Sequence, residues 1–256
     1  MHALTRQPSP AFARCQLSHL ERQPIDLERA RQQHAAYGEL LAQLGCTVAE
    51  LPGEARFPDC VFVEDTAVVV DELAVIARPG APSRRGETEA VAAALTGLRP
   101  LARITAPGTL DGGDVLRLGR RVFVGRSART DRQGRAQLRA LLEPHGYQVT
   151  GVDLRGCLHL KSAVTAVGDE TLLVHPPWVD TSPFAGCELL PVDPSEPFAA
   201  NALRVGEAVV LPAAFARTRE RLERRGLEVH PLAVDELAKA EGGVTCCSLL
   251  VASPGD

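Results

Sequence analysis

The sequence predicts an α/β fold assembled from copies of one unit, in which two strands, a helix and a third strand follow one another. Three observations support this prediction. Segments with helical periodicity recur along the chain, a short apolar stretch follows each of them, and a hairpin pattern follows most of those stretches. A self-similar unit of roughly 40–50 residues is typical of a repeated supersecondary block. A plain α+β sandwich with accidental spacing is the alternative.

The predicted helices share an amphipathic pattern. The first lies in DLERARQQHAAYGELLAQLG, where Asp26 can cap the start and Gly45 suits the end. Its apolar face comprises Leu27, Ala30, Tyr37, Leu40, Leu41 and Leu44. Similar segments follow as RRGETEAVAAALTGL, TDRQGRAQLRALLEPHG and FARTRERLERRG, and a weaker, Pro-rich segment takes the same place in a further unit.

The predicted third strand of each unit is a short apolar stretch after the helix. The five stretches are CTVAEL, LARITA, YQVTGVDL, CELLPV and LEVHPL. They begin at residues 46, 101, 147, 187 and 227, so their separations are 55, 46, 40 and 40 residues. This regular spacing favours the repeat over the sandwich.

The predicted hairpins have apolar arms around a polar turn. Four are complete: VEDTAVVVDELAVI, GGDVLRLGRRVFVG, KSAVTAVGDETLLV and AANALRVGEAVVL. The fifth has one arm, VTCCSLLV, which reads as a buried strand near the C-terminus. The opening segment of the chain could supply its second arm and close a ring. No linker interrupts the pattern, so residues 1–256 are predicted to form a single domain.

Composition narrows the class of protein. Of the 256 residues 45% are apolar and 23% charged, as in an ordinary soluble globular protein, and the net charge of −4 argues against a nucleic-acid or anionic-membrane partner. No apolar run approaches the roughly 18 residues of a membrane span. Seven cysteines without a signal peptide or a Cys-x-x-Cys pair indicate reduced thiols and a cytoplasmic location.

The reactive candidates occupy one place in the repeat, the start of a hairpin's first strand. They are Asp65, Asp111 with Asp114, His159 and Cys246. If the units surround an axis, these positions converge at its centre, and the paired glycines 112 and 113 leave room there for a ligand to approach the backbone. The sequence therefore predicts a central site.

A cysteine and a histidine at this site suggest nucleophilic catalysis. A thiol attacks as the thiolate, which a nearby cation favours, and an imidazole can deliver a proton to a leaving group near neutral pH. Because adjacent side chains on a strand face opposite sides, Cys246 and Cys247 cannot serve equally in the same reaction. The alternative is a buried, inert cysteine and a core histidine.

Carboxylates beside a thiol would raise its pKa, so they make sense only if the substrate is a cation. Asp59, Glu64 and Asp65 lie in FPDCVFVEDT, and a planar guanidinium is the cation that paired carboxylates bind best. Arg84 and Arg129 each open a predicted helix near the same rim and suit a substrate carboxylate. Arginine and its N-substituted relatives carry both a guanidinium and a carboxylate. Turn residues with solvated strand ends, Asp114 among them, and surface arginines are the alternative.

Six ordered motifs carry a family resemblance that spans residues 12–251. FPDCVFVEDTAVV, RPGAPSRRGE, TLDGGDVL, ARTDRQG, LHLKS and GGVTCCS resemble the dimethylarginine dimethylaminohydrolases, members of the guanidino-group-modifying (pentein) superfamily. The resemblance implies a five-bladed α/β propeller without a cofactor. It also implies hydrolysis of Nω,Nω-dimethyl-L-arginine, and of the monomethyl form, to L-citrulline and the methylamine.

By this resemblance Cys246 is the nucleophile, His159 the general acid and base, and Asp111 the acid that orients the histidine, although some relatives carry glutamate there. Cys247 faces the other side and serves packing. The resemblance assigns the substrate-binding roles to Leu20, Asp59, Glu64, Asp65, Arg84, Arg129 and Ala240. Asp65 would bind the guanidinium with help from Glu64 and Asp59, and the two arginines the α-carboxylate. Ala240 would offer its backbone, and Leu20, or else Leu17, would touch ligand from an N-terminal lid.

Other interpretations remain open. Cys246, Cys247 and His159 could capture an inhibitory zinc ion, but they lack the spacing of a structural or catalytic zinc site. An arginine deiminase or an amidinotransferase is the nearest alternative enzyme, although the chain is short for either. A non-catalytic propeller, like the ribosomal anti-association factor that shares this general fold, would not need these reactive side chains. The expected partner is a methylated arginine, and the protein is expected to be a monomer or a homodimer.

Overall fold

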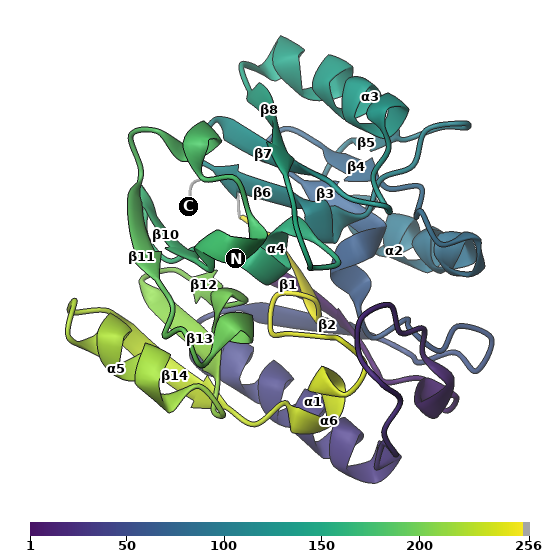
Figure 1. Ribbon diagram of the computed structural model, residues 1–256. Helices are drawn as coiled ribbons and strands as arrows, with labels where there is room; N and C mark the ends of the chain where they lie inside the picture. The colour runs from purple at the N-terminus through teal and green to yellow at the C-terminus, as the bar shows by residue number, and fades with distance from the viewer. Residues whose placement is uncertain (253–256) are drawn as a thin grey trace.

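Five three-stranded sheets with one topology form the molecule. The structure, a computed structural model, describes residues 1–252. In each sheet a central strand pairs antiparallel with one neighbour and parallel with the other, in the orders β15-β1-β2, β3-β4-β5, β6-β7-β8, β9-β10-β11 and β12-β13-β14. Figure 1 shows the longer helices outside the ring of sheets. This arrangement confirms the five-bladed α/β propeller.

The strands are short. Their bounds are β1 His2–Arg6, β2 Thr47–Leu51, β3 Ala67–Val69, β4 Ala74–Ile76, β5 Leu101–Arg103, β6 Val115–Leu118, β7 Arg121–Arg126, β8 Gln148–Asp153, β9 Val164–Ala166, β10 Thr171–Val174, β11 Glu188–Pro191, β12 Leu203–Val205, β13 Ala208–Pro212, β14 Glu228–Leu232 and β15 Ser248–Val251. Each predicted apolar stretch after a helix contains a parallel third strand, and each predicted hairpin an antiparallel pair. The repeat was therefore visible in the sequence.

Four of the described helices connect the hairpin of a blade to its third strand, and two short ones connect one blade to the next. Their bounds are α1 Leu27–Gln43, α2 Thr88–Leu95, α3 Arg132–Leu142, α4 Leu160–Ala163, α5 Ala216–Glu223 and α6 Asp235–Ala238. The 3₁₀ turns are η1 Phe12–Arg14, η2 Val63–Thr66, η3 Pro82–Glu87, η4 Gly112–Asp114, η5 Glu143–His145, η6 Pro176–Trp178, η7 Ser182–Phe184 and η8 Pro197–Ala200. In the blade of β9–β11 the Pro-rich segment forms only η6 and η7, because proline cannot supply the backbone donors of a continuous helix.

Helix α1 forms where its capping residues predict. The Asp26 carboxylate accepts a hydrogen bond from the Arg29 backbone N–H at 3.0 Å, which satisfies one of the free donors of the first turn. Gly45 has φ +88°, a left-handed conformation that glycine adopts without strain, and follows the end of the helix. The predicted apolar face packs against β1 and the segment that carries Cys247.

The first and last strands close the ring. β1 pairs antiparallel with β15, from His2 opposite Val251 to Thr5 opposite Ser248, and parallel with β2. The opening segment therefore supplies the second arm of the fifth hairpin, as predicted. Closure leaves each blade in contact with two neighbours, and apolar side chains of adjacent blades form the core.

The reactive residues do not lie on strands. The segment VTCCSLLV was predicted to be a strand throughout, but β15 begins only at Ser248, and both cysteines lie in the preceding turn. The prediction was wrong there because the Cys246 N–H bonds to the carbonyl of Gly243, which bends the backbone away from the sheet. Turns of this kind precede the first strand of every hairpin, and they meet at the centre of the ring.

Within residues 1–252, no helix has the length and apolar character that crossing a membrane requires.

We expect Tyr37→Phe to lower the free energy of unfolding by about 1–3 kcal/mol, because it leaves buried acceptors without a donor. The fully buried Tyr37 hydroxyl lies 2.9 Å from the carbonyl oxygen of Val244 and 2.7 Å from Ser248 Oγ, and so joins α1 to the turn before β15. Urea unfolding of the native protein and of this variant measures the difference.

Tyr147→Phe is the matched control. The Tyr147 hydroxyl contacts Glu72 at 2.9 Å, and that carboxylate can turn to solvent. Its loss should therefore cost less than about 1 kcal/mol. Equal losses in the two variants would contradict a special role for Tyr37.

Candidate active site

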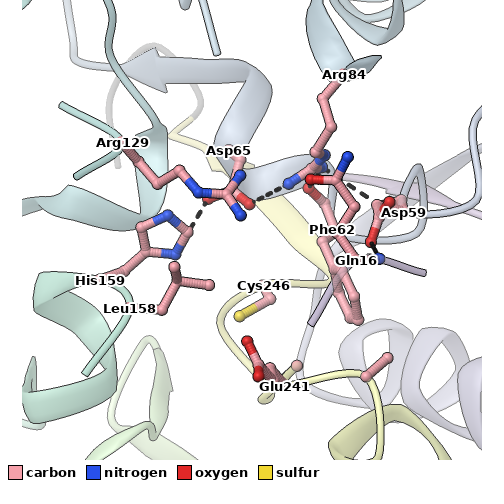
Figure 2. Close-up of a pocket in the computed structure, with 12 residues that line it drawn as sticks. Gln16, Asp59, Phe62, Asp65, Arg84, Arg129, Leu158, His159, Glu241 and Cys246 are labelled. Carbon is pink, nitrogen blue, oxygen red and sulfur yellow. Dashed lines mark hydrogen bonds and ion pairs between the residues drawn. The ribbon is translucent and has the colours of Figure 1, made fainter. Parts of the chain in front are cut away.

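The turns at the centre of the ring enclose a small polar cavity. Its lining residues are Gln16, Asp59, Phe62, Asp65, Arg84, Arg129, Leu158, His159, Ala240, Glu241, Gly242 and Cys246. Figure 2 shows His159, Asp65 and Cys246 facing the same space from different blades. The structure thus brings together the predicted thiol, imidazole and carboxylates.

His159 lies between two carboxylates. Its Nε2 is 3.0 Å from Asp111 Oδ2, and its Nδ1 is 3.7 Å from Asp65 Oδ1. Burial alone would lower the pKa of this histidine, but the charges of Asp65, Asp111 and Asp114 outweigh it and raise the pKa to about 9. His159 is therefore an imidazolium at neutral pH and holds a proton at the cavity wall.

Asp65 is fixed from three sides. The Gly113 N–H donates to its Oδ1 at 3.0 Å, Arg84 contacts its Oδ2 at 2.5 Å, and His159 is the third partner. Burial would raise the pKa of Asp65, but His159 and Arg84 together lower it, so the carboxylate stays charged. A Cβ at Gly113 would lie 2.7 Å from both Asp65 Oδ1 and His159 Nδ1, so this contact requires glycine.

Asp111 and Asp114 are both fully buried and support the histidine in different ways. Asp111 contacts the imidazole directly, while its Oδ1 accepts the Gly80 N–H at 2.8 Å. Asp114 accepts the N–H of Leu160 at 3.0 Å and so holds the start of α4, next to His159. The interpretation of Asp114 as a solvated turn residue was wrong, because the segment before β6 turns inward rather than toward solvent.

Cys246 has a protonated thiol in this environment. Burial, followed by the charges of Glu64 and Asp65, raises the pKa of Cys246 to about 12. The Gly243 N–H lies 3.4 Å from its sulfur. Among residues 1–252, no hydrogen bond or ion pair joins Cys246 to His159, so the two groups face one cavity without forming a thiolate–imidazolium pair.

Cys247 points the other way. It is buried in the apolar cluster of α1 and β1, its sulfur lies 3.6 Å from the Gly243 carbonyl, and its pKa is raised well above the usual value, chiefly by burial. The two cysteines therefore face opposite sides, although a turn rather than a strand separates them. Because Cys247 faces the core, it cannot join Cys246 and His159 in a zinc site, which corrects that part of the zinc hypothesis.

Glu64 does not line the cavity, although it was predicted to help bind a guanidinium. Its carboxylate pairs with Lys161 Nζ at 2.5 Å and accepts a hydrogen bond from Thr245 Oγ1 at 2.8 Å. Asn201 Nδ2 donates to Thr245 Oγ1 at 2.9 Å and extends the network. Burial raises the pKa of Glu64, and Lys161 counters that effect. This buried network lies next to Cys246, whose carbonyl accepts the Glu64 N–H at 3.1 Å.

Sequence reasoning missed Lys161 and Asn201, although a signal for each existed. Lys161 comes two residues after His159 in LHLKS. Asn201 precedes the first strand of the β12–β13 hairpin, the same place in the repeat that Asp65, Asp111 and His159 occupy in theirs. All five blades therefore place a polar or reactive side chain at this position.

The two predicted arginines are not equivalent. Arg84 is 5% exposed, and its guanidinium contacts Asp65, Glu87 and the carbonyl oxygens of Asp59 and Phe62. Arg129 is less engaged: Nη2 lies 3.4 Å from Ser18 Oγ, and Nη1 lies 4.0 Å from Asp111 Oδ2. Both border the cavity, but Arg129 has more donors available for a ligand.

Asp59 and Ala240 also border the cavity, as predicted. Asp59 Oδ1 accepts the Gln16 N–H at 2.9 Å, and burial raises the pKa of this carboxyl. Neither lid leucine reaches the cavity. Leu17 packs against the cluster around α1, and Leu20, at 38% exposed, borders a different cavity. Gln16, which sequence reasoning missed, is the part of the N-terminal segment that lines the polar cavity.

A second, wider cavity of about 780 Å³ adjoins the first. Its walls are largely apolar and include Leu20, Phe198 and Phe215. Leu158, Glu241, Gly242 and Cys246 border both cavities. Cys246 therefore lies between a charged pocket and an apolar one.

Three donor groups in the polar cavity are close enough together for a metal ion. One atom each of Asp65, Asp111 and His159 lies within 4.8 Å of the others, a grouping found in the part of the chain that the structure describes. His159 is protonated at neutral pH, and Arg84 forms an ion pair with Asp65. A metal ion would therefore have to displace both the His159 proton and the Arg84 guanidinium. Inhibitory zinc binding at Cys246 stays a prediction.

Comparison with known proteins places this site in a family. No family model matches the chain. A dimethylarginine dimethylaminohydrolase of Streptomyces coelicolor is 42% identical over 248 residues, which cover 96% of this chain and 95% of that protein. The enzyme of the same name from Pseudomonas aeruginosa is 38% identical over 226 residues, covering 88% and 89% of the two chains.

Solved structures of proteins with the same name also resemble this chain. A cysteine-to-serine mutant of the Pseudomonas aeruginosa enzyme complexed with citrulline superposes with a TM-score of 0.92 at 35% identity, covering 97% of this chain and 98% of that one. A dimethylarginine dimethylaminohydrolase with a histidine-to-glycine change, as an adduct with S-methyl-L-thiocitrulline, gives the same TM-score at 37% identity and the same coverage. Identity of this extent over nearly the whole length, together with the shared fold, shows that the chain belongs to the dimethylarginine dimethylaminohydrolase family.

Proposed function

We propose that this protein hydrolyses Nω,Nω-dimethyl-L-arginine, and Nω-monomethyl-L-arginine, to L-citrulline and the corresponding methylamine. The observation that carries the proposal is the cavity that a thiol and a protonated imidazole share with the carboxylates of Asp59 and Asp65. The family membership supports it, as does the relative that was crystallised with citrulline.

The charges around the cavity suggest how the substrate lies. The guanidinium would contact the charged carboxylate of Asp65, near His159 and Cys246. Arg129, with Arg84 beside it, would bind the α-carboxylate, and Asp59 and the backbone of Ala240 the α-ammonium. Because Arg84 already holds four protein groups, we expect Arg129 to make the larger direct contribution and Arg84 to hold Asp65 in place.

The nucleophile depends on the substrate for its activation. The pKa of Cys246 is high because of burial and of the charges of Glu64 and Asp65. A bound guanidinium offsets those negative charges, so the thiol loses its proton to solvent only when the substrate is present. The thiolate then attacks the central guanidinium carbon and forms a tetrahedral adduct.

His159 then acts as acid and as base. Its imidazolium donates a proton to the departing dimethylamine, since an amide anion cannot leave, and the C–N bond breaks to give a thiouronium on Cys246. The neutral imidazole next takes a proton from water, and the resulting hydroxide attacks the same carbon. The C–S bond breaks, the sulfur leaves as the thiolate, and the added hydroxyl loses its proton to solvent as citrulline forms, while Asp111 keeps the ring oriented throughout.

Product analysis separates this proposal from the other guanidine enzymes. We expect dimethylamine and citrulline from dimethylarginine, with much slower ammonia release from plain arginine. Faster ammonia release from plain arginine would instead favour an arginine deiminase. Chromatography of derivatised amines measures both products.

Cys246→Ser should lower turnover by about 1,000-fold or more, because a hydroxyl is a far weaker nucleophile here. Cys247→Ser should keep activity within about threefold, because its sulfur faces the core. Acid quenching of the native enzyme during turnover, followed by peptide mass spectrometry, should find the adduct on Cys246. Similar activity losses in the two variants would contradict the assignment.

The raised pKa of His159 predicts a pH-dependent stability. A group whose pKa rises on folding stabilises the fold fully below its unfolded value and loses that contribution as pH rises through the folded value. Between pH 6.5 and about 9.5 the native protein should therefore lose about 3 kcal/mol of unfolding free energy that His159→Gln does not lose. Urea unfolding across this range tests it, with His145→Gln on the surface as the control. Parallel curves for the native protein and His159→Gln would refute the assigned protonation state.

A further inference from the structure

Residues 15–25, here called the N-terminal loop, contribute to the lining of both cavities. The loop has neither helix nor strand and connects η1 to α1. Gln16 borders the polar cavity, and His19 and Leu20 border the apolar one. The loop therefore borders both of the cavities that Cys246 borders.

One carboxylate holds the middle of the loop. Glu241 Oε1 accepts the backbone N–H groups of Ser18, His19 and Leu20, at 2.8, 2.5 and 2.7 Å. Three successive amides directed at one oxygen form a concave anion site of the kind that backbone turns make. Hydrogen bonds to a charged acceptor are stronger than neutral ones. Glu241 thus anchors the middle of the loop, and Lys239 holds its end through the Pro24 carbonyl at 3.1 Å.

The backbone of Glu241 is held in an unusual conformation. Its φ is +62°, and it is the only non-glycine residue with a positive φ within residues 1–252. Such a conformation costs energy for a residue with a side chain and persists only where its surroundings impose it. A Cβ at the neighbouring Gly242 would lie 2.1 Å from the Phe62 ring, so the segment has little freedom to shift.

The carboxylate has no second structural task. Its Oε2 is buried and makes no hydrogen bond among the described residues. Figure 2 shows Glu241 close to Cys246 at the same pocket. Because Glu241 also binds the backbone of residues 18–20, it connects the N-terminal loop to the segment that carries Cys246. A glycine would suit the backbone here better than glutamate, which leaves the side chain as the reason for the residue.

The loop has two further contacts with the polar cavity, and both involve groups that the proposed function assigns to the substrate. Asp59 accepts the Gln16 N–H at 2.9 Å, and Arg129 lies 3.4 Å from Ser18 Oγ. A bound amino acid would compete for these two side chains through its ammonium and carboxylate. Glu241 takes no part in that competition.

We propose that Glu241 is the latch of the active site, a positioning residue that keeps the N-terminal loop over the bound substrate. Its effect on catalysis rests on the proposed function, whereas its hold on the loop does not. With the latch made, the loop limits access of bulk water to the reacting groups; with the latch broken, substrate enters and product leaves. Glu241 acts through the loop and does not contact the reacting atoms.

Hydrogen–deuterium exchange tests the latch without any substrate. Glu241→Gly removes the carboxylate and relieves the positive φ, so the fold should be retained while the amides of residues 18–20 exchange at least tenfold faster. Glu241→Gln keeps an uncharged acceptor and should give an intermediate rate. Glu21→Gln changes an exposed acid in the same loop that makes no hydrogen bond among the described residues, and it should leave exchange unchanged. Unchanged exchange in Glu241→Gly would refute the latch.

Kinetics with dimethylarginine test its role in the reaction. We expect Glu241→Gly to raise KM about tenfold while kcat changes less than about threefold, since the chemistry of Cys246 and His159 is intact. Faster exchange with an unchanged KM would refute the role in substrate retention. A native enzyme that does not hydrolyse dimethylarginine would refute the proposed function instead, and the exchange experiment would still decide whether Glu241 holds the loop.

Discussion

One set of buried carboxylates favours the protonated form of two different groups at this site. Burial, followed by the charges of Glu64 and Asp65, raises the pKa of Cys246, and Asp65 raises the pKa of His159 against the effect of burial. The same negative charge therefore keeps the acid protonated, as the proposed reaction needs, and keeps the nucleophile protonated, which the reaction cannot use. Only an added positive charge changes the second state, and a cationic substrate supplies it. In the proposed reaction, binding of a guanidinium and activation of the thiol are thus one electrostatic event.

The propeller fold stabilises the buried charges at the site. Turns from different blades meet at the ring centre, and their backbone N–H groups hold the acids there: Gly113 for Asp65 and Gly80 for Asp111. Buried charges are tolerated only when they are paired and hydrogen-bonded. Arg84 pairs with Asp65 at the cavity wall, and Lys161 pairs with Glu64 in the buried network beside it. Pairing β1 with β15 completes the ring that holds these turns in place.

The nucleophile lies at a boundary between two environments. Charged groups border it on one side, and the wider apolar cavity borders it on the other. The N-terminal loop spans both, and Glu241 ties that loop to the segment that carries Cys246. Closing the site and placing the nucleophile are in this way mechanically connected, because one short stretch of chain, residues 240–246, takes part in both.

The sequence alone predicted the repeat, the closure of the ring, and the convergence of Cys246, His159 and Asp65 at its centre, because hydrophobic periodicity and repeat position are local properties of the chain. It also separated Cys246 from Cys247, although the reason was a turn and not a strand. Only the tertiary structure decided which charges pair. Lys161 forms an ion pair with Glu64, and Arg84 forms one with Asp65. Asp114 accepts a hydrogen bond from the Leu160 N–H at the start of α4. Those partners are 97, 19 and 46 residues apart, and such contacts depend on how the blades pack, which no local pattern specifies.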